Sequence, residues 1–196
     1  HKIKEFNLDI DWNNKFFTPF DYGYFSFIYD QTKLSTPPQS FDELASRNEI
    51  SLIIMDPRYS TPGLGLAKWI DQVYQDDAVE FWKNLQDQIV ITSKSWSDGY
   101  GLFLEGESDI VLSYTTSPAY HSLIEGNANY QSLNMTEGHA VQIEVMGILK
   151  NASNIAKEIV AGSPNALFKP PTPSSLPWIR VFIPTIMVSN LFTSPL

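Results

Sequence analysis

Cysteine and long apolar runs are both missing from this sequence of 196 residues. Without cysteine, the chain cannot form a disulfide scaffold, a cysteine-ligated metal site or a thiol nucleophile. The longest apolar candidate, residues 181–192, is interrupted by Pro184, Ser189 and Asn190. Because a transmembrane helix needs about 20 predominantly apolar residues, we expect a chain that does not span a membrane.

Basic side chains are outnumbered, since 13 Lys and Arg stand against 22 Asp and Glu and leave a formal net charge of −9. Nucleic acids and anionic membrane surfaces repel such a chain, so nucleic-acid binding is not expected. A cationic ligand would not be repelled. The hydrophobic content of 43% and the aromatic content of 13% predict a packed globular core.

Recognisable catalytic motifs are also absent. The histidines His1, His121 and His139 are scattered and lack the spacing of metal ligands. The sequence contains no Gly-x-Ser-x-Gly elbow, no phosphate-binding loop and no dinucleotide-binding glycine fingerprint. We therefore expect no enzyme activity, no bound metal and no cofactor, and we interpret His121 and His139 as surface residues or hydrogen-bonded core residues.

Predicted strands and helices alternate along most of the chain. Strands are predicted over residues 25–29, 51–55, 89–92, 110–114 and 140–146. Helices are predicted over residues 60–74, 78–85, 97–105, 117–126 and 154–160, and a capping box of Ser40 and Glu43 opens a further short helix. Pro62 suits the start of the helix at 60–74, and its apolar face is predicted from the spacing of Leu66, Trp69, Ile70 and Val73. Gly106 is expected to end the helix at 97–105. This alternation predicts an α/β fold, with a mostly parallel sheet and helices on its faces.

Three strand-to-helix junctions, residues 58–63, 93–98 and 114–120, follow three of the predicted strands. The carboxyl ends of parallel strands meet at one edge of a sheet, and ligands collect beyond that edge. We therefore expect these junctions to share one edge, which we call the rim, and we expect the ligand there.

The first junction combines Ser60, Thr61 and Gly63 at the start of a helix. The unpaired N–H groups and partial positive charge of a helix N-terminus can hold a phosphate or carboxylate group, and hydroxyls add donors. The alternative is an ordinary N-cap that satisfies only the helix itself.

The other two junctions carry aromatic side chains. Trp96 stands at the second junction, and Tyr114 and Tyr120 flank the hydroxyl-rich helix start at the third. Such rings can form a clamp around a flat or cationic ring, although each could instead belong to the core. The rim would suit a ligand with a phosphate at one end and a flat cationic ring at the other.

These same junctions resemble the thiamine-binding periplasmic proteins. The resemblance runs from residue 10 to about residue 160 and rests on ordered motifs: PFDYGYF at 19–25, DPRYSTPGLG at 56–65, WSDGYGLF at 96–103 and GESDIVLSYTTSPAY at 106–120. It implies a type II periplasmic-binding-protein fold whose two lobes close over thiamine, thiamine monophosphate or thiamine diphosphate.

The resemblance also implies the site and the partners. It assigns the phosphate end to Ser60, Thr61 and Gly63, and the thiamine rings to Trp96, Tyr114 and Tyr120, with Ser117 and Ala119 beside them. A monomer in the periplasm would deliver the ligand to the permease and ATPase subunits of an ABC importer, as a transported ligand rather than a cofactor.

Compared with that family, the chain is expected to hold one complete lobe and part of a second. We expect a remnant of lobe one and a hinge strand at 1–44, lobe two at 45–120, a return crossover with lobe-one elements at 121–162, and a divergent tail at 163–196. The proline-rich tail prompts the hypothesis of a non-native reading frame or a degraded end.

Three alternatives remain open at this point. The same fold could carry ferric iron, another anion or a polyamine. The chain could be a thiamine-converting enzyme, although such enzymes commonly use a cysteine nucleophile and this chain has none. A fragment without its opposing lobe could also bind nothing.

Overall fold

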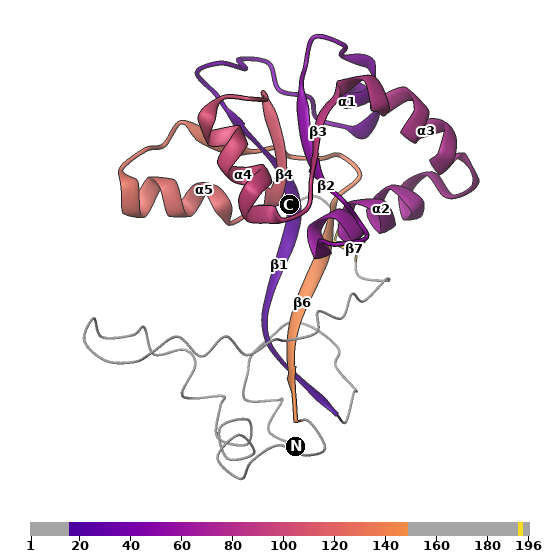
Figure 1. The fold of residues 1–196 in the computed structure, drawn as a ribbon, viewed down its shortest axis with the longest axis vertical. Helices are drawn as coiled ribbons and strands as arrows, with labels where there is room; N and C mark the ends of the chain where they lie inside the picture. Colours follow the sequence, from indigo (N-terminus) through magenta and orange to yellow (C-terminus); the bar gives the residue numbers. More distant parts are fainter. Residues whose placement is uncertain (1–15, 149–191, 194–196) are drawn as a thin grey trace. The chain divides into compact units, whose positions relative to one another are not determined.

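The computed structural model describes residues 16–148 and 192–193 and divides into two compact units. The larger unit contains residues 23–142 and 187–196, and the smaller unit contains residues 1–22 and 143–186. The unit boundaries fall inside strand β1 (Phe17–Asp30) and strand β6 (His139–Gly147). Figure 1 shows both strands as long ribbons, and the candidate site lies in the larger unit.

The sheet has the strand order β3-β2-β4-β1-β6-β7, and β5 pairs with β1. Its remaining strands are β2 (Leu52–Met55), β3 (Ile89–Ser93), β4 (Ile110–Tyr114), β5 (Tyr130–Ser132) and β7 (Phe192–Thr193). Strand β2 is parallel to both β3 and β4. Strand β1 is antiparallel to β4 and β5, and β6 is antiparallel to β7.

The α/β class is as predicted, and the strands within the predicted lobe at 45–120 are parallel as expected, while β1 adds antiparallel pairing to the same sheet. Parallel pairing is confined to β3, β2 and β4, which are connected by helical crossovers that bring each strand back in the same direction. Strand β1 precedes this alternating stretch. The alternation therefore says nothing about the direction of β1, which runs against β4.

The helices follow the predicted pattern within the described residues. They are α1 (Phe41–Ser46), α2 (Thr61–Tyr74), α3 (Ala78–Leu85), α4 (Trp96–Glu105) and α5 (Ser117–Tyr120), with 3-10 turns at Gln75–Asp77 and Gln86–Gln88. Helix α5 continues as a π-helical turn, His121–Glu125. Figure 1 shows α1, α2 and α3 grouped on one side and α4 and α5 on the other. The predicted helix at 154–160 lies outside the described residues.

Local capping explains where several helices begin and end. The Ser40 side chain accepts a hydrogen bond from Glu43 N at 3.0 Å and so caps α1, as the predicted capping box requires. Gly106 ends α4 with φ 93°, a left-handed conformation that glycine adopts without strain. These local signals are readable from sequence, which is why the predicted helices are found.

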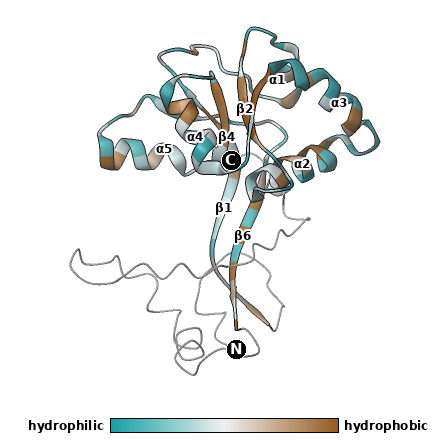
Figure 2. Cartoon of the chain, viewed as in Figure 1, coloured by the Kyte–Doolittle hydropathy of each residue, from teal (hydrophilic) through white to brown (hydrophobic). Residues whose placement is uncertain are grey.

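An aromatic core joins the first helices to the sheet. Leu66, Trp69 and Ile70 form the predicted apolar face of α2, and all three are fully buried. The Trp69 ring packs on Phe41 and Phe27, with centroid distances of 4.8 and 6.0 Å. Figure 2 colours β2 and β4 as hydrophobic, consistent with strands covered on both faces.

Glycine at the start of α2 lets the helix approach the strands closely. A Cβ atom at Gly63 would lie 2.2 Å from the Met55 carbonyl oxygen at the end of β2. A Cβ atom at Gly65 would lie 2.3 Å from the Phe25 ring. Any side chain at these positions would push α2 away from the sheet edge where the candidate site lies.

Candidate ligand-binding site

The predicted rim exists in the structure. Strand β2 lies between β3 and β4 and is parallel to both, so the carboxyl ends of the three strands meet at one edge. Helix α2 begins beyond β2, α4 beyond β3 and α5 beyond β4. This topology brings the three junctions, which are far apart in sequence, to the same edge of the larger unit.

In the part of the chain that the structure describes, the first turn of α2 has no side-chain cap. Ser60 is its buried N-cap residue, yet within the described chain the Ser60 side chain makes no capping hydrogen bond. In contrast, Ser95 caps α4 by accepting from Asp98 N at 3.1 Å. Since the Ser60 hydroxyl leaves them uncapped, the N–H groups of Thr61 and Gly63 suit an anion, as an anionic group would accept from them.

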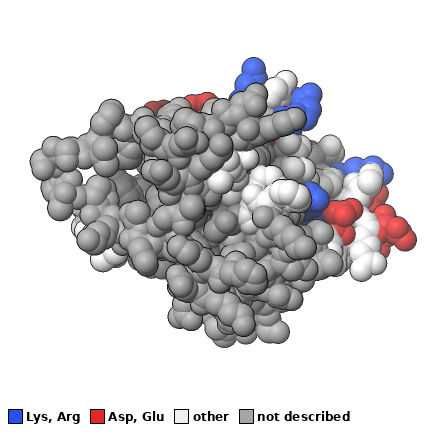
Figure 3. All heavy atoms as spheres, turned by 90° about the horizontal axis from the view of Figure 1, so that it is seen from below, with Lys and Arg blue, Asp and Glu red and all other residues white. Residues whose placement is uncertain are grey.

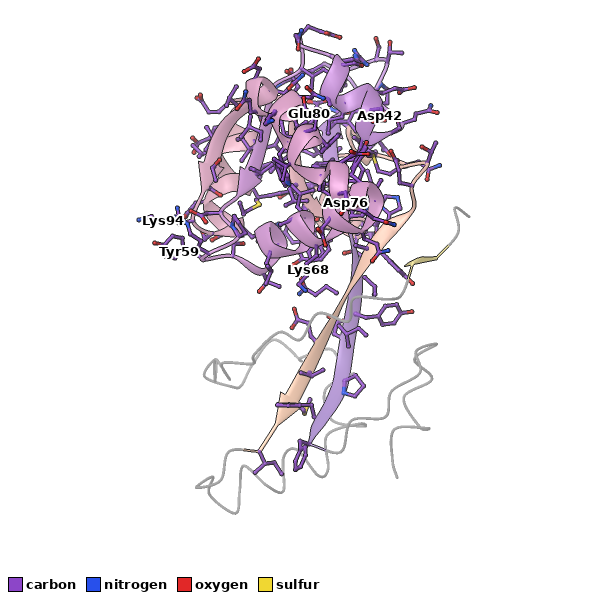
Figure 4. All side chains as sticks on the ribbon, turned by 90° about the vertical axis from the view of Figure 1, so that its right-hand side faces the viewer. Asp42, Tyr59, Lys68, Asp76, Glu80 and Lys94 are labelled. Carbon is purple, nitrogen blue, oxygen red and sulfur yellow. The ribbon has the colours of Figure 1, made fainter. Side chains whose placement is uncertain are left out.

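Two cations gather beside this helix start. The Arg58 guanidinium carbon and the Lys94 ammonium lie 5.5 and 5.8 Å from the Tyr59 ring centroid. Figure 4 shows Tyr59 and Lys94 together at one edge of the larger unit. On the face drawn in Figure 3, basic side chains stand among acidic ones, so the negative net charge does not exclude local positive charge.

The Arg58 guanidinium also binds Asp56 at the end of β2. Arg58 Nε donates to Asp56 Oδ1 at 3.0 Å, and Nη2 donates to Oδ2 at 2.6 Å. These side-chain hydrogen bonds, followed by the bond from Arg58 N, lower the pKa of Asp56 to about 2. Asp56 therefore stays ionised at ordinary pH and fixes the loop that leads into α2.

The predicted ring-binding residue Trp96 is the first residue of α4 and keeps 37% of its surface exposed. Its indole Nε1 donates to Ser113 Oγ on β4 at 2.8 Å. The indole ring stacks on Tyr100 with a centroid distance of 5.1 Å and an interplanar angle of 24°. The hydrogen bond to Ser113 and the stacking on Tyr100 thus hold Trp96 in place while its ring stays partly accessible, as a stacking platform requires.

Tyr114 lies next to Trp96, and the structure brings these two predicted residues together. Their ring centroids are 6.4 Å apart, at an angle of 54°. Tyr114 stacks on Phe25 at 5.3 Å, and its hydroxyl donates to Gln142 Oε1 at 3.0 Å. Since Phe25 is fully buried, it ties Tyr114 to the core of the unit.

The residues predicted on α5 are accessible but differ in their contacts. Tyr120 is 58% exposed, and its ring packs edge-on against His121 at 5.7 Å. Ala119 beside it is also exposed. Ser117 is half-buried, and its hydroxyl lies 2.8 Å from Ser113 Oγ, the group that holds Trp96. Tyr120 therefore belongs to the rim through His121 rather than through Trp96 or Tyr114.

The sequence did not predict that Ser113 and Tyr100 contact Trp96, or that His121 contacts Tyr100 and Tyr120. The spacing of four residues between Trp96 and Tyr100 on one helix is the signal that could have identified their stacking. Burial, before any other cause, raises the pKa of Tyr100 to about 12. Ser113 is one residue of an apolar strand, and no local pattern links it to Trp96.

Both internal histidines have hydrogen-bond partners, and His121 is a buried core residue while His139 is half-buried. His121 is 2% exposed and lies between the Tyr100 hydroxyl and the Glu125 carboxylate. His139 Nδ1 lies 2.9 Å from the Phe25 carbonyl oxygen. Among the described residues, no group of three or more His, Asp or Glu side chains could hold a metal ion. None of the helices in that part of the chain has the length and apolarity of a membrane span.

Comparison with known sequences places this geometry in a family context. The model of the bacterial extracellular solute-binding proteins matches residues 2–161. The thiamine-binding periplasmic protein of Escherichia coli strain K12 is 55% identical over 140 residues, which are 71% of this chain and 43% of that protein. The thiamine-binding periplasmic protein of Haemophilus influenzae is 45% identical over 153 residues, or 78% and 46% of the two chains. The chain spans less than half the length of these curated relatives.

Solved structures show the same fold. A periplasmic thiamin binding protein superposes with a TM-score of 0.78 at 49% identity, covering 81% of this chain and 51% of that one. The periplasmic binding protein AfuA from Actinobacillus pleuropneumoniae, with fructose-6-phosphate bound, gives a TM-score of 0.63 at 20% identity, covering 74% and 47%. The second likeness concerns the fold alone.

Proposed function

The chain belongs to the family of bacterial extracellular solute-binding proteins, and from this we propose that it is part of a periplasmic subunit that captures thiamine, thiamine monophosphate and thiamine diphosphate for an ABC importer. Two observations together support the proposal. The chain is 55% identical to a thiamine-binding relative, and its rim combines a helix start that no side chain of the described residues caps with the rings of Trp96 and Tyr114. The family match spans residues 2–161 and so includes every residue of the rim.

At the phosphate end, Ser60, Thr61 and Gly63 supply hydroxyls and backbone N–H groups at the start of α2. The helix dipole adds a favourable potential for an anion. Lys94 lies beside this turn over the Tyr59 ring and raises the positive potential further, whereas the charge of Arg58 is offset by its ion pair with Asp56. A phosphate at this position would be held by donors that the helix itself leaves uncapped.

At the ring end, Trp96, Tyr114 and Tyr120 present aromatic surface to the thiamine rings, with Ser117 and Ala119 beside them. The thiazolium ring of thiamine is cationic, and a cation over an aromatic face gains roughly 0.5–2 kcal/mol per contact. The net charge of −9 further favours a cationic ligand. Ring contacts of this kind bind a ligand reversibly and without a covalent step, as a carrier requires.

The remaining features of the proposal follow the family. The protein acts in the periplasm as a monomer, uses no cofactor, and delivers thiamine to a permease and an ATPase. The lobe boundaries expected from the sequence, at residues 1–44, 45–120, 121–162 and 163–196, belong to the same proposal. Closure of two lobes over the ligand would complete the site that the rim begins.

Isothermal titration of the protein with thiamine and with its two phosphates tests the function. We expect saturable one-to-one binding with a dissociation constant on the order of 1 µM or lower, and tighter binding of the phosphorylated forms if the α2 start holds phosphate. Absence of heat at micromolar ligand would contradict the proposal.

A second candidate is a different phosphorylated solute. The first turn of α2, which has no side-chain cap among the described residues and has Lys94 beside it, favours any phosphate group and not thiamine phosphate alone. The same titration with a sugar phosphate separates the two candidates. Binding of the sugar phosphate without binding of thiamine would favour the second.

A further inference from the structure

The side chain of His121 is buried behind the rim and has a hydrogen-bond partner on each ring nitrogen. It is the first residue of the π-helical turn that follows α5 and is 2% exposed. The Tyr100 hydroxyl lies 2.9 Å from Nε2, and Glu125 Oε2 lies 2.7 Å from Nδ1. Each ring nitrogen of His121 therefore has a polar partner within hydrogen-bond distance, and the imidazole is held from both sides.

The imidazole ring of His121 connects two parts of the rim that are not otherwise in ring contact among the described residues. On one side, the His121 ring stacks on the Tyr100 ring, with a centroid distance of 5.8 Å and an interplanar angle of 17°. Tyr100 in turn stacks on Trp96. On the other side, the exposed Tyr120 ring packs edge-on against the same imidazole. The Tyr130 ring also packs against His121, with a centroid distance of 4.4 Å.

The local backbone supports this arrangement. A π-helical turn is rare, and such turns are frequent at functional sites because they redirect side chains. Here the turn places Glu125 four residues after His121, with the carboxylate on the imidazole, and Gly126 ends it with φ 67°. His121 and Tyr100 are buried, whereas the Glu125 side chain is 45% exposed, so the imidazole is held between a buried hydroxyl and a carboxylate at the surface. A ring held in this way lowers the entropy lost when a ligand orders the exposed rings packed against it.

We propose that His121 is a positioning residue, which fixes Trp96 through Tyr100 and fixes Tyr120 directly, so that both rings are pre-arranged for the flat rings of the ligand. The identity of the ligand as thiamine rests on the function proposed above. The orientation of Trp96 in the free protein does not depend on that ligand. His121 itself is too buried to touch a ligand, so it acts through its neighbours.

The test uses three variants of the network. Tyr100→Phe keeps the ring that stacks on Trp96 and removes the hydroxyl that is hydrogen-bonded to His121. His121→Leu removes both hydrogen bonds, whereas His121→Gln keeps an acceptor and a donor and serves as the conservative rescue. Tyr74→Phe is the control for loss of a tyrosine hydroxyl, because Tyr74 donates to Asp42 Oδ1 at 2.6 Å, in an exposed bond away from the rim.

The first readout needs no ligand. The chain is labelled with 5-fluorotryptophan, and the resonance of Trp96 among the five tryptophans is assigned by its loss in Trp96→Phe. We expect the Trp96 fluorine resonance to shift or broaden in Tyr100→Phe and His121→Leu, to stay near its original position in His121→Gln, and to be unchanged in Tyr74→Phe. A merely structural role would lower thermal stability without moving this resonance selectively.

The second readout is the dissociation constant for thiamine. We expect affinity to fall on the order of two- to tenfold in Tyr100→Phe, to fall further in His121→Leu, and to recover in His121→Gln. An unmoved Trp96 resonance in both Tyr100→Phe and His121→Leu, or an equal loss of affinity in Tyr74→Phe, would overturn the positioning role. If no form of the protein binds thiamine while the resonance moves as expected, the positioning role stands and the thiamine assignment fails.

Discussion

Trp96 donates its indole hydrogen to Ser113 Oγ at 2.8 Å, a bond that ties the first turn of α4 to the interior of β4. Ser113 is fully buried, and its hydroxyl also lies 2.8 Å from Ser117 Oγ at the start of α5. Elements that follow β3 and β4 are therefore joined at one hydroxyl group. This contact keeps a partly exposed tryptophan in one place on the rim.

Replacing Ser113 with alanine should weaken thiamine binding on the order of two- to tenfold, because the Trp96 indole loses its acceptor and its fixed orientation. The matched control is Ser108→Ala. Ser108 is also buried and donates to the Ile110 carbonyl at 2.9 Å, but that bond lies at the opposite end of β4. Calorimetric titration of both variants is the measurement. Equal affinities would contradict the role of the Trp96–Ser113 bond.

Replacing Trp96 with alanine should cost about 1–3 kcal/mol of thiamine binding free energy, as expected for the loss of a stacking contact. Trp82→Ala on α3 is the control, since Trp82 is half-buried but lies away from the rim. Affinity is measured by titration and folding by thermal melting. An affinity unchanged in Trp96→Ala would make Trp96 a structural residue only.

Replacing Gly63 with alanine should destabilise the fold by about 1–3 kcal/mol, because the added Cβ would lie 2.2 Å from the Met55 carbonyl oxygen. Gly101→Ala on α4 makes the same change where nothing lies within 4 Å of the added atom. It should be neutral or stabilise by up to about 1 kcal/mol. Urea unfolding measures both, and similar stabilities of the two variants would contradict the close packing of α2 on β2.

The pair of Asp56 and Arg58 should make stability depend on acid pH. The pKa of Asp56 is lowered in the folded protein from 3.8 to about 2, chiefly by the hydrogen bonds from Arg58. The contribution of the carboxylate is therefore complete above the unfolded pKa and is lost as the pH falls towards 2. Urea midpoints of the wild type and Asp56→Asn should differ at pH 6 and converge between about pH 4 and pH 2. A difference that stays constant over this range would contradict the shift.

Elements with local signals were predictable. Helix α2 was predicted from Pro62 and the spacing of Leu66, Trp69 and Ile70, and α4 from Gly106 at its end. The rim was predicted because parallel strands joined by helices must end at one edge, and the pairing of β2 with its two neighbours confirms it. These features depend on residues close together in sequence or on a general rule of topology.

Contacts between distant segments were not predictable in the same way. The antiparallel direction of β1 depends on its pairing with β4, which joins residues as far apart in sequence as Phe25 and Tyr114. The sequence placed Trp96, Tyr114 and Tyr120 on one rim, but not the bond from Trp96 to Ser113 or the contact of Tyr120 with His121. A short strand such as β5 pairs only with β1 and has no local pattern of its own.

The most direct test of the central claim is calorimetric titration of the protein with thiamine monophosphate, beside the variant Trp96→Ala. The account predicts one-to-one binding on the order of 1 µM or tighter for the wild type, and affinity weaker by roughly 5- to 150-fold for the variant. A wild-type protein that releases no heat with thiamine monophosphate, or a variant that binds it as tightly as the wild type, would contradict the claim that this rim holds thiamine.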